Sequence, residues 1–225
     1  MPWHVVYPTP DSGPMSLVLA SSSPYRSALL ARLGLPFSVM VPAVDESPRG
    51  DETPERLVRR LAQAKARSVA AGEALVIGSD QVACCHDQVL GKPGDLQRAR
   101  AQLEQVSGQR VEFLTGLALF NPCSGAVQVD CIRFRAYFRT LSRAQIEGYV
   151  AREQPLDCAG SFKSEGLGIA LFHRLEGDDP TALVGLPLMR LVEMLAAEGI
   201  DVLSTTGPTR RTVLADKAYP PSGRA

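Results

Sequence analysis

Basic and acidic side chains occupy loops and element ends along the chain, in a pattern that suits the binding of a phosphorylated ligand. The candidate cations are Arg26, Lys65, Lys92 and Lys163, and the candidate acids are Asp45, Glu46, Asp80 and Glu165. Each residue is weak evidence by itself. Together in one cleft they would suit a polyphosphate with a bridging divalent ion, because cations bind phosphate oxygens and carboxylates hold the metal.

The segment SSSPYR, residues 21–26, places several hydroxyl groups at the start of an expected helix. Ser23 is expected to cap that helix, with Pro24 at its first position. Free backbone N–H groups at a helix N-terminus, with Arg26 in the first turn, form an anion site. Plain capping of a surface helix is the alternative. The Rossmann and Walker phosphate cradles are excluded, since neither glycine motif occurs.

Lys65 lies on the apolar stripe of a second expected helix, residues 54–71. Val58, Leu61, Lys65 and Val69 follow one another at spacings of three and four. A lysine at such a position must either extend its amine to solvent or meet an anion, because a buried unpaired ammonium is costly. Both alternatives stay open at this point.

Asp80 follows the apolar strand expected at residues 74–78. Ligands of open α/β sheets gather outside the carboxyl ends of strands, so an acid there is well placed for chemistry. A strand-end cap is the alternative for Asp80. Asp45 and Glu46 lie in a loop, where simple solvation is the alternative.

Strand and helix patterns alternate along the chain. Strands are expected at 16–20, 37–41, 74–78, 111–121, 127–139 and 167–172, with a hairpin at 82–90. Helices are expected at 24–33, 54–71, 96–106, 142–151 and 187–197, and Ser142 with Gln145 forms a capping box. The alternation predicts an α/β fold with a mixed, twisted central sheet and helices on both faces.

Length and composition indicate one ordered domain, residues 16–203, between a flexible N-terminal extension at 1–15 and a disordered tail at 204–225. The 24 basic and 24 acidic residues balance, which argues against a nucleic-acid-binding protein. No apolar run is long enough to span a membrane. Five cysteines without paired spacing indicate reduced thiols and a cytoplasmic location.

Six motifs carry a resemblance to a known family. LASSSPYR, VDES, LAQAKA, IGSDQV, GKP and CAGSFKSEG occur in the order and at the separations of the Maf-like nucleoside triphosphate pyrophosphatases. The resemblance covers about residues 16–199 and is closest to the subgroup acting on 7-methyl-GTP. The positions that distinguish this subgroup are Tyr25, Gln81 and Glu165.

The resemblance implies a deep cleft in a fold shared with inosine triphosphate pyrophosphatases, a divalent cation (Mg or Mn) and a cytoplasmic location. It implies a small nucleotide as the substrate, and a homodimer is among the arrangements the family adopts. The implied reaction hydrolyses 7-methyl-GTP to 7-methyl-GMP and pyrophosphate, which keeps modified nucleotides out of RNA.

The resemblance also implies roles for individual residues. Asp80 matches the catalytic proton acceptor, and Ser21, Arg26, Glu46, Lys65 and Lys92 match phosphate- and metal-handling positions. The residue pattern adds Lys163 to the phosphate-binding cations and Asp45 to the metal ligands Glu46 and Asp80. Whether Asp80 is a general base or mainly a metal ligand stays open.

One departure from many family members lies beside the first helix, where Tyr25 replaces the first of two arginines and Ser27 follows Arg26. Ser27 lowers the local positive charge and so would weaken phosphate binding. Methylation at N7 makes the guanine ring cationic, so an arginine would repel the ring, whereas the face of Tyr25 attracts it. Glu165 can accept from the base N–H groups, and Gln81 can bond a remaining edge.

Two alternatives remain from the sequence. One is a dTTP/UTP-type pyrophosphatase of the same family, against which Tyr25, Gln81 and Glu165 argue. The other is a nucleotide-binding regulator of septum formation and cell division, which would need no catalytic acid.

Overall fold

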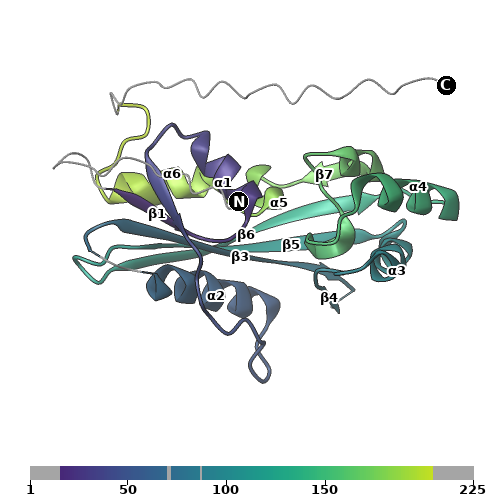
Figure 1. Cartoon of the computed structure of the whole chain (residues 1–225), viewed down its shortest axis with the longest axis horizontal. Coiled ribbons are helices and arrows are strands. Elements are labelled where there is room, and N and C mark those ends of the chain that lie inside the picture. The colour runs from purple at the N-terminus through teal and green to yellow at the C-terminus, as the bar shows by residue number, and fades with distance from the viewer. Residues whose placement is uncertain (1–15, 70–71, 87, 205–225) are drawn as a thin grey trace, which may run out of the picture.

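A seven-stranded sheet forms the centre of the molecule (Figure 1). The computed structural model describes residues 16–69, 72–86 and 88–204. The strands are β1 (Leu17–Ala20), β2 (Phe37–Met40), β3 (Leu75–Cys85), β4 (Gln88–Leu90), β5 (Arg110–Phe120), β6 (Val127–Phe138) and β7 (Phe172–Glu176). The α-helices are α1 (Pro24–Ala31), α2 (Pro54–Ser68), α3 (Leu96–Val106), α4 (Arg143–Glu153), α5 (Thr181–Val184) and α6 (Leu188–Ala197). Two 3₁₀ segments, η1 (Ala159–Ser161) and η2 (Leu167–Leu171), complete the described elements.

The sheet is mixed, as predicted. Its order is β2-β1-β3-β5-β6-β7, and β4 pairs with the end of β3. β1 runs parallel to both of its neighbours, whereas β3, β5, β6 and β7 pair antiparallel in succession. β3 therefore lies at the centre, where the parallel part of the sheet meets the antiparallel part.

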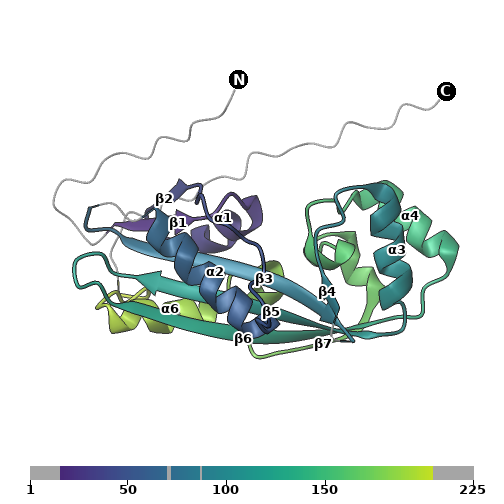
Figure 2. The ribbon, with the colours of Figure 1, turned by 90° about the horizontal axis from the view of Figure 1, so that it is seen from below.

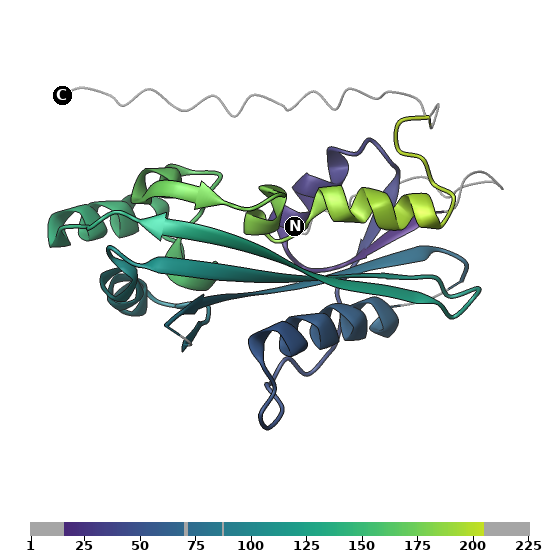
Figure 3. The ribbon, with the colours of Figure 1, turned by 180° about the vertical axis from the view of Figure 1, so that it is seen from behind.

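Helices cover both faces of the sheet, which confirms the predicted α/β architecture. α2 packs on one face, and α1 and α6 lie on the other (Figures 1 and 3). Seen from below, α3 and α4 lie together at the far end of the long strands, away from α1 and α2 (Figure 2). We call the end built from α1, α2 and α6 the proximal lobe. The end built from α3, α4, η1 and η2 is the distal lobe.

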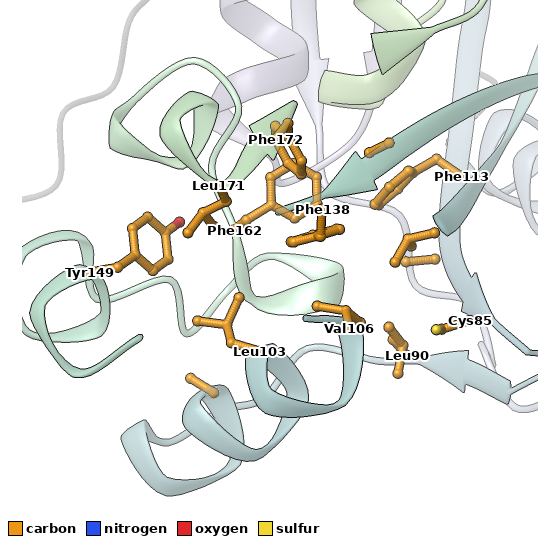
Figure 4. Close-up of a cluster of buried hydrophobic side chains, with 14 of the residues drawn as sticks. Cys85, Leu90, Leu103, Val106, Phe113, Phe138, Tyr149, Phe162, Leu171 and Phe172 are labelled. Atoms are coloured by element: carbon orange, nitrogen blue, oxygen red, sulfur yellow. The ribbon is translucent and has the colours of Figure 1, made fainter. Parts of the chain in front are cut away.

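Each lobe has its own apolar core. The distal core contains four buried phenylalanines in edge-to-face contact (Figure 4), with ring centroids 4.7 Å apart for Phe138 and Phe172 and 5.2 Å apart for Phe113 and Phe162. The proximal cores are mainly aliphatic, with residues such as Leu30 and Leu191 on the α1 side of the sheet. The long strands β3, β5 and β6 connect the two lobes.

β3 is longer than the sequence indicates, because the predicted strand continues through polar residues into the predicted hairpin. Ser79 and Asp80 are buried within it. The hydroxyl of Ser79 lies 2.9 Å from the carbonyl oxygen of Gly116 and 2.8 Å from that of Gly185. Polar side chains with satisfied hydrogen bonds can continue a buried strand, so the prediction that the strand ends at Gly78 was wrong.

The prediction of a strand at 167–172 was also wrong. Residues 167–171 form η2, and the strand that follows is β7. Gly168 lies against the backbone of Lys163, where an added Cβ atom would stand 2.3 Å from the carbonyl oxygen. This close return of the chain requires glycine and a tight helical turn rather than an extended strand.

The predicted helix starts are confirmed. Ser23 and Thr53 accept hydrogen bonds as N-caps, and both bonds of the capping box between Ser142 and Gln145 are present. The first two helices end a few residues earlier than expected, at Ala31 and Ser68.

Several expectations concern the chain as a whole. No disulfide joins the five cysteines, all of which lie in described segments. The described helices include none with the length and apolar character that crossing a bilayer requires. The expected extension at 1–15 lies outside the described residues, as does the expected tail at 204–225 apart from Ser204. The expected domain limits, 16–203, stay a prediction.

Candidate active site

A cleft of about 630 Å³ opens between the two lobes. Its lining comes from α1, the loop before α2, α2 itself, the middle of β3, the segment after β4, and the chain around η1 and α5. Of the residues predicted for the site, the cleft lining contains Ser21, Tyr25, Arg26, Glu46, Lys65, Asp80, Gln81, Lys92 and Glu165. Residues far apart in sequence thus converge on one cavity.

Lys65 forms the centre of an ion-pair cluster in this cleft. Its Nζ atom lies 2.6 Å from Oδ1 of Asp80 and 2.6 Å from Oε1 of Glu46. The lysine side chain is 7% exposed and that of Asp80 is 11% exposed, whereas that of Glu46 is 60% exposed. The hydrogen bond from Lys65 lowers the pKa of Glu46 below its ordinary value. The structure therefore shows that the Lys65 amine pairs with anions and does not extend to solvent.

Two glycines allow α2 to bring Lys65 this close to the sheet. A Cβ atom on Gly78 would stand 2.1 Å from the carbonyl oxygen of Ala62, and one on Gly116 would stand 2.1 Å from that of Val58. Gly116 is also the residue directly opposite Asp80 in the β3–β5 pair. The helix backbone therefore packs directly on the strands beside the catalytic candidate.

The start of α1 contributes hydroxyl groups and a guanidinium. Ser21 Oγ accepts from the backbone N–H of Ser23 at 3.1 Å, and Ser23 Oγ accepts from that of Arg26 at 3.4 Å. Nε of Arg26 donates to the carbonyl oxygen of Gly185 at 2.8 Å, which fixes the side chain against the α5 turn. Burial lowers the pKa of Arg26, and the nearby charges of two acids, Asp80 and Glu46, oppose that shift.

Gln81 follows Asp80 on β3 and lies in the cleft wall. Its amide nitrogen lies 2.9 Å from Oγ1 of Thr115 and 2.7 Å from the carbonyl oxygen of Ala182. This nitrogen therefore anchors α5 to the sheet. The side-chain oxygen of Gln81 accepts no hydrogen bond from the residues that the structure describes, so this oxygen is available to a ligand.

Tyr25, in the first turn of α1, lies beside acidic side chains. Its hydroxyl donates to Oδ2 of Asp157 at 3.4 Å. Burial raises the pKa of Tyr25, and the charges of Cys158, Asp157 and Glu165 raise it further. Glu165 accepts a hydrogen bond from the hydroxyl of Ser164 at 3.1 Å.

Asp157 and Cys158 are cleft residues that the sequence analysis missed. Both directly precede the turn that begins at Ala159, and Cys158 opens one of the six motifs. Burial raises the pKa of the Cys158 thiol to about 12, so this cysteine is protonated at neutral pH. The proximity of Asp157 to the motif was the available signal.

Two predicted site residues do not line the cleft. Nζ of Lys163 lies 3.3 Å from the carbonyl oxygen of Glu153 and 3.9 Å from Oδ1 of Asp157. Asp45 is exposed, and its carboxylate accepts the backbone N–H of Ser47 at 3.0 Å. Phosphate binding by Lys163 and metal binding by Asp45 stay predictions that this arrangement does not favour. Lys92, in contrast, lines the cleft, and its charge contributes to the lowered pKa of Glu46.

The donor chemistry of the cleft fits a hard divalent cation. Asp80 and Glu46 contribute carboxylate oxygens that converge on one point, now held by the Lys65 ammonium. No group of three or more potential metal-ligating side chains occurs among the residues that the structure describes. Mg²⁺ is commonly bound by one or two carboxylates together with substrate phosphates, so this pair is sufficient on the protein side.

Comparison with known proteins places the chain among relatives of similar length. A family model described as Maf-like protein matches residues 16–198. A 7-methyl-GTP pyrophosphatase from Nitrosococcus oceani is 57% identical over 196 residues, which cover 86% of this chain and 98% of that protein. One from Vibrio cholerae is 56% identical over 188 residues, covering 83% and 97%. Among solved structures, a HAM1 protein from Coxiella burnetii covers 81% of this chain and 99% of its own, with 16% identity and a TM-score of 0.47.

Proposed function

Because the chain belongs to the Maf-like protein family, we propose that it is a nucleoside triphosphate pyrophosphatase acting on 7-methyl-GTP. Relatives of that name share more than half of their residues with it over nearly their whole length. The products are 7-methyl-GMP and pyrophosphate. The enzyme thereby keeps a modified nucleotide from entering RNA.

The contact that carries this proposal is the buried Lys65 between Asp80 and Glu46 in the cleft. A buried ion cluster of this kind adds little stability over well-packed apolar residues in its place, because burying charges costs about as much as their attraction returns. A cleft that holds two acids around one cation, with Arg26 and Lys92 nearby, is suited to a substrate with several phosphates. A protein that only binds nucleotides would not need the Asp80 carboxylate beside Lys65.

The chemical step assigned to Asp80 is the acceptance of a proton from the attacking water. The water oxygen forms a bond to the α-phosphorus, and the bond from that phosphorus to the bridging oxygen of the β-phosphate breaks. The leaving pyrophosphate carries away the electron pair of that bond. Asp80 is oriented for this step by its hydrogen bond from Lys65.

Phosphate charge is balanced by side chains from three segments. Arg26, Lys65 and Lys92 provide cations, and Ser21 lies in the short segment before α1, where hydroxyl and backbone N–H groups gather. Charge grows on the leaving pyrophosphate in the transition state, and fixed cations in a cleft stabilise it without reorganisation. A divalent cation, Mg or Mn, held by Asp80 and Glu46, would supply further charge neutralisation at the α-phosphate.

We assign binding of the guanine base of the substrate to the region around Tyr25. N7-methylation gives the guanine ring a positive charge, and the face of a tyrosine attracts such a ring by about 0.5–2 kcal/mol. Glu165 accepts from the base N–H groups, and the side-chain oxygen of Gln81 bonds a remaining edge. Cytoplasmic location, a homodimeric state, and a small nucleotide rather than nucleic acid as partner belong to the same proposal.

A panel of nucleoside triphosphates, assayed for pyrophosphate release with Mg²⁺ and with Mn²⁺, tests the proposal. The panel includes 7-methyl-GTP, GTP, UTP and dTTP, with Asp80→Asn as the matched control. A higher kcat/KM for 7-methyl-GTP than for GTP supports the proposed function. Preference for UTP and dTTP would assign the chain to the other subgroup. Nucleotide binding without pyrophosphate release would identify a regulator.

A further inference from the structure

We propose that Asp157 is a specificity-determining residue that favours a positively charged purine at the base end of the cleft. This inference rests on the proposed function and adds a residue to it. Asp157 lies between α4 and η1, in the distal lobe, and lines the cleft. Its side chain is 57% exposed, so it stands at the opening of the cavity rather than in its floor.

Asp157 faces Tyr25 directly across the cleft opening. Oδ2 of Asp157 accepts the Tyr25 hydroxyl at 3.4 Å, although 132 positions separate the two residues in the chain. The carboxylate therefore lies at the edge of the ring on which the base is expected to stack. A base on the face of Tyr25 would have this negative charge beside it.

Charges in the cleft are divided between two regions. The acids that act on Arg26 are Asp80 and Glu46, which share Lys65. The acids near Tyr25 are instead Asp157 and Glu165. In the region around Arg26, cations balance the acids, so this region suits phosphates. In the region around Tyr25, acidic side chains are in excess.

A cation, Lys163, approaches the acids near Tyr25. Nζ of Lys163 lies 3.9 Å from Oδ1 of Asp157, the oxygen that Tyr25 does not use, and also donates to the carbonyl oxygen of Glu153. A separation of 3.9 Å is too long for a direct hydrogen bond, so Lys163 only partly balances the carboxylate. Asp157 and Glu165 together thus outweigh Lys163 among these described charges near Tyr25.

The excess of negative charge around Tyr25 allows the cleft to distinguish a cationic base from a neutral one. GTP and 7-methyl-GTP carry the same phosphates and the same base edge, and they differ by a methyl group and one positive charge on the ring. A carboxylate near the ring attracts the charged base and has no such effect on the neutral one. Asp157 therefore affects the ratio of the kcat/KM values for 7-methyl-GTP and GTP.

The experiment compares wild-type enzyme with Asp157→Asn, which keeps an acceptor for the Tyr25 hydroxyl but removes the charge. Tyr25→Phe keeps the ring and removes the hydrogen bond. Asp178→Asn is the matched control, because Asp178 is an exposed acid outside the cleft lining. Each variant is assayed for kcat/KM with 7-methyl-GTP and with GTP at mildly acidic pH, where the base keeps its positive charge. Dissociation constants for 7-methyl-GMP and GMP give a second readout that needs no turnover.

We expect Asp157→Asn to lower the preference for 7-methyl-GTP over GTP by about threefold to tenfold. This is the scale expected when one carboxylate charge near a cationic ring is removed in partly aqueous surroundings. The loss should appear in KM and in 7-methyl-GMP binding, and it should diminish at high salt. Tyr25→Phe and Asp178→Asn should keep the ratio within about twofold, since neither removes a charge near the ring.

Two results would overturn the inference. If Asp157→Asn lowers kcat/KM equally for both substrates, or changes neither, the residue has no role in selecting charge. That result would leave the proposed function intact. If the wild-type enzyme hydrolyses GTP as well as 7-methyl-GTP, the proposed function fails and the inference fails with it.

Discussion

Replacing Gly116 by alanine should weaken the fold and the site together. Gly116 lies on β5 opposite Asp80, and the α2 backbone packs directly against it. An added Cβ atom would stand 2.1 Å from the carbonyl oxygen of Val58 and 2.5 Å from its carbonyl carbon. Both are backbone atoms of a helix, so no side-chain rotation can relieve the overlap.

The size of the effect follows from that distance. Ordinary contact begins at 3.4 Å, so α2 must move away from the sheet by about 1.3 Å. Overpacking of this kind costs about 1–3 kcal/mol. In a domain of this size that is a fall in Tm of roughly 2–12 °C. The same movement carries Lys65 away from Asp80, and a misplacement of about 1 Å can cost on the order of 100-fold in rate.

Thermal unfolding and kcat/KM, measured on the same preparation, check this prediction. Gly148→Ala is the matched control, because Gly148 lies on α4 with nothing within 4 Å of its would-be Cβ atom. Alanine in a helix interior is better than glycine by about 1 kcal/mol, so the control should keep or raise Tm and keep activity.

A Gly116→Ala enzyme with wild-type Tm and wild-type kcat/KM would refute the reasoning. It would mean that α2 does not need its close approach to place Lys65. A lower Tm with unchanged kcat/KM would separate the two effects, leaving the glycine necessary for packing but not for the site.

Three further predictions concern the site itself. Asp80→Asn should lower kcat by about 10²- to 10⁴-fold, the scale of a lost general base, and near-normal turnover would contradict that role. The pKa of Glu46 is held below its ordinary value of 4.5 by Lys65, so the ion pair stabilises the fold above that pH and loses its effect as the pH falls through the lowered value. The difference in Tm between wild type and Glu46→Gln should accordingly shrink on acidification below about 4.5. Tyr25→Arg should shift preference from 7-methyl-GTP toward GTP and UTP, and an unchanged ratio of kcat/KM values would argue against stacking on Tyr25.

Local sequence signals predicted the elements that begin with a clear cap. Ser23, Thr53 and Ser142 start their helices as expected, because capping depends on residues three or four positions apart. The position of Lys65 on an apolar stripe left two outcomes open, an amine that extends to solvent or one that meets an anion, and the structure shows the second. Its two partners could not be assigned from spacing, since Glu46 comes from a loop and Asp80 from a strand.

Features that depend on distant contacts could not be predicted. β3 continues through Ser79 because carbonyl groups from β5 and from the α5 turn meet its hydroxyl. The cleft position of Asp157 depends on the approach of the distal lobe to α1, which no local pattern encodes. Lys163 belongs to a matching motif, yet its amine meets the end of α4 instead of the cleft.

The division of the molecule into two separately packed cores has a consequence for how ligands bind. Arg26 and Lys65 stand on the proximal lobe, whereas Asp157 and Glu165 stand on the distal lobe. A whole nucleotide would contact both lobes, and so would a nucleoside whose base lies between Tyr25 of α1 and Asp157, whereas free pyrophosphate would meet Arg26 and Lys65 of the proximal lobe. Affinities for a free nucleoside and for free pyrophosphate should therefore fail to add up to that of the intact molecule, because in the intact molecule the second part binds intramolecularly.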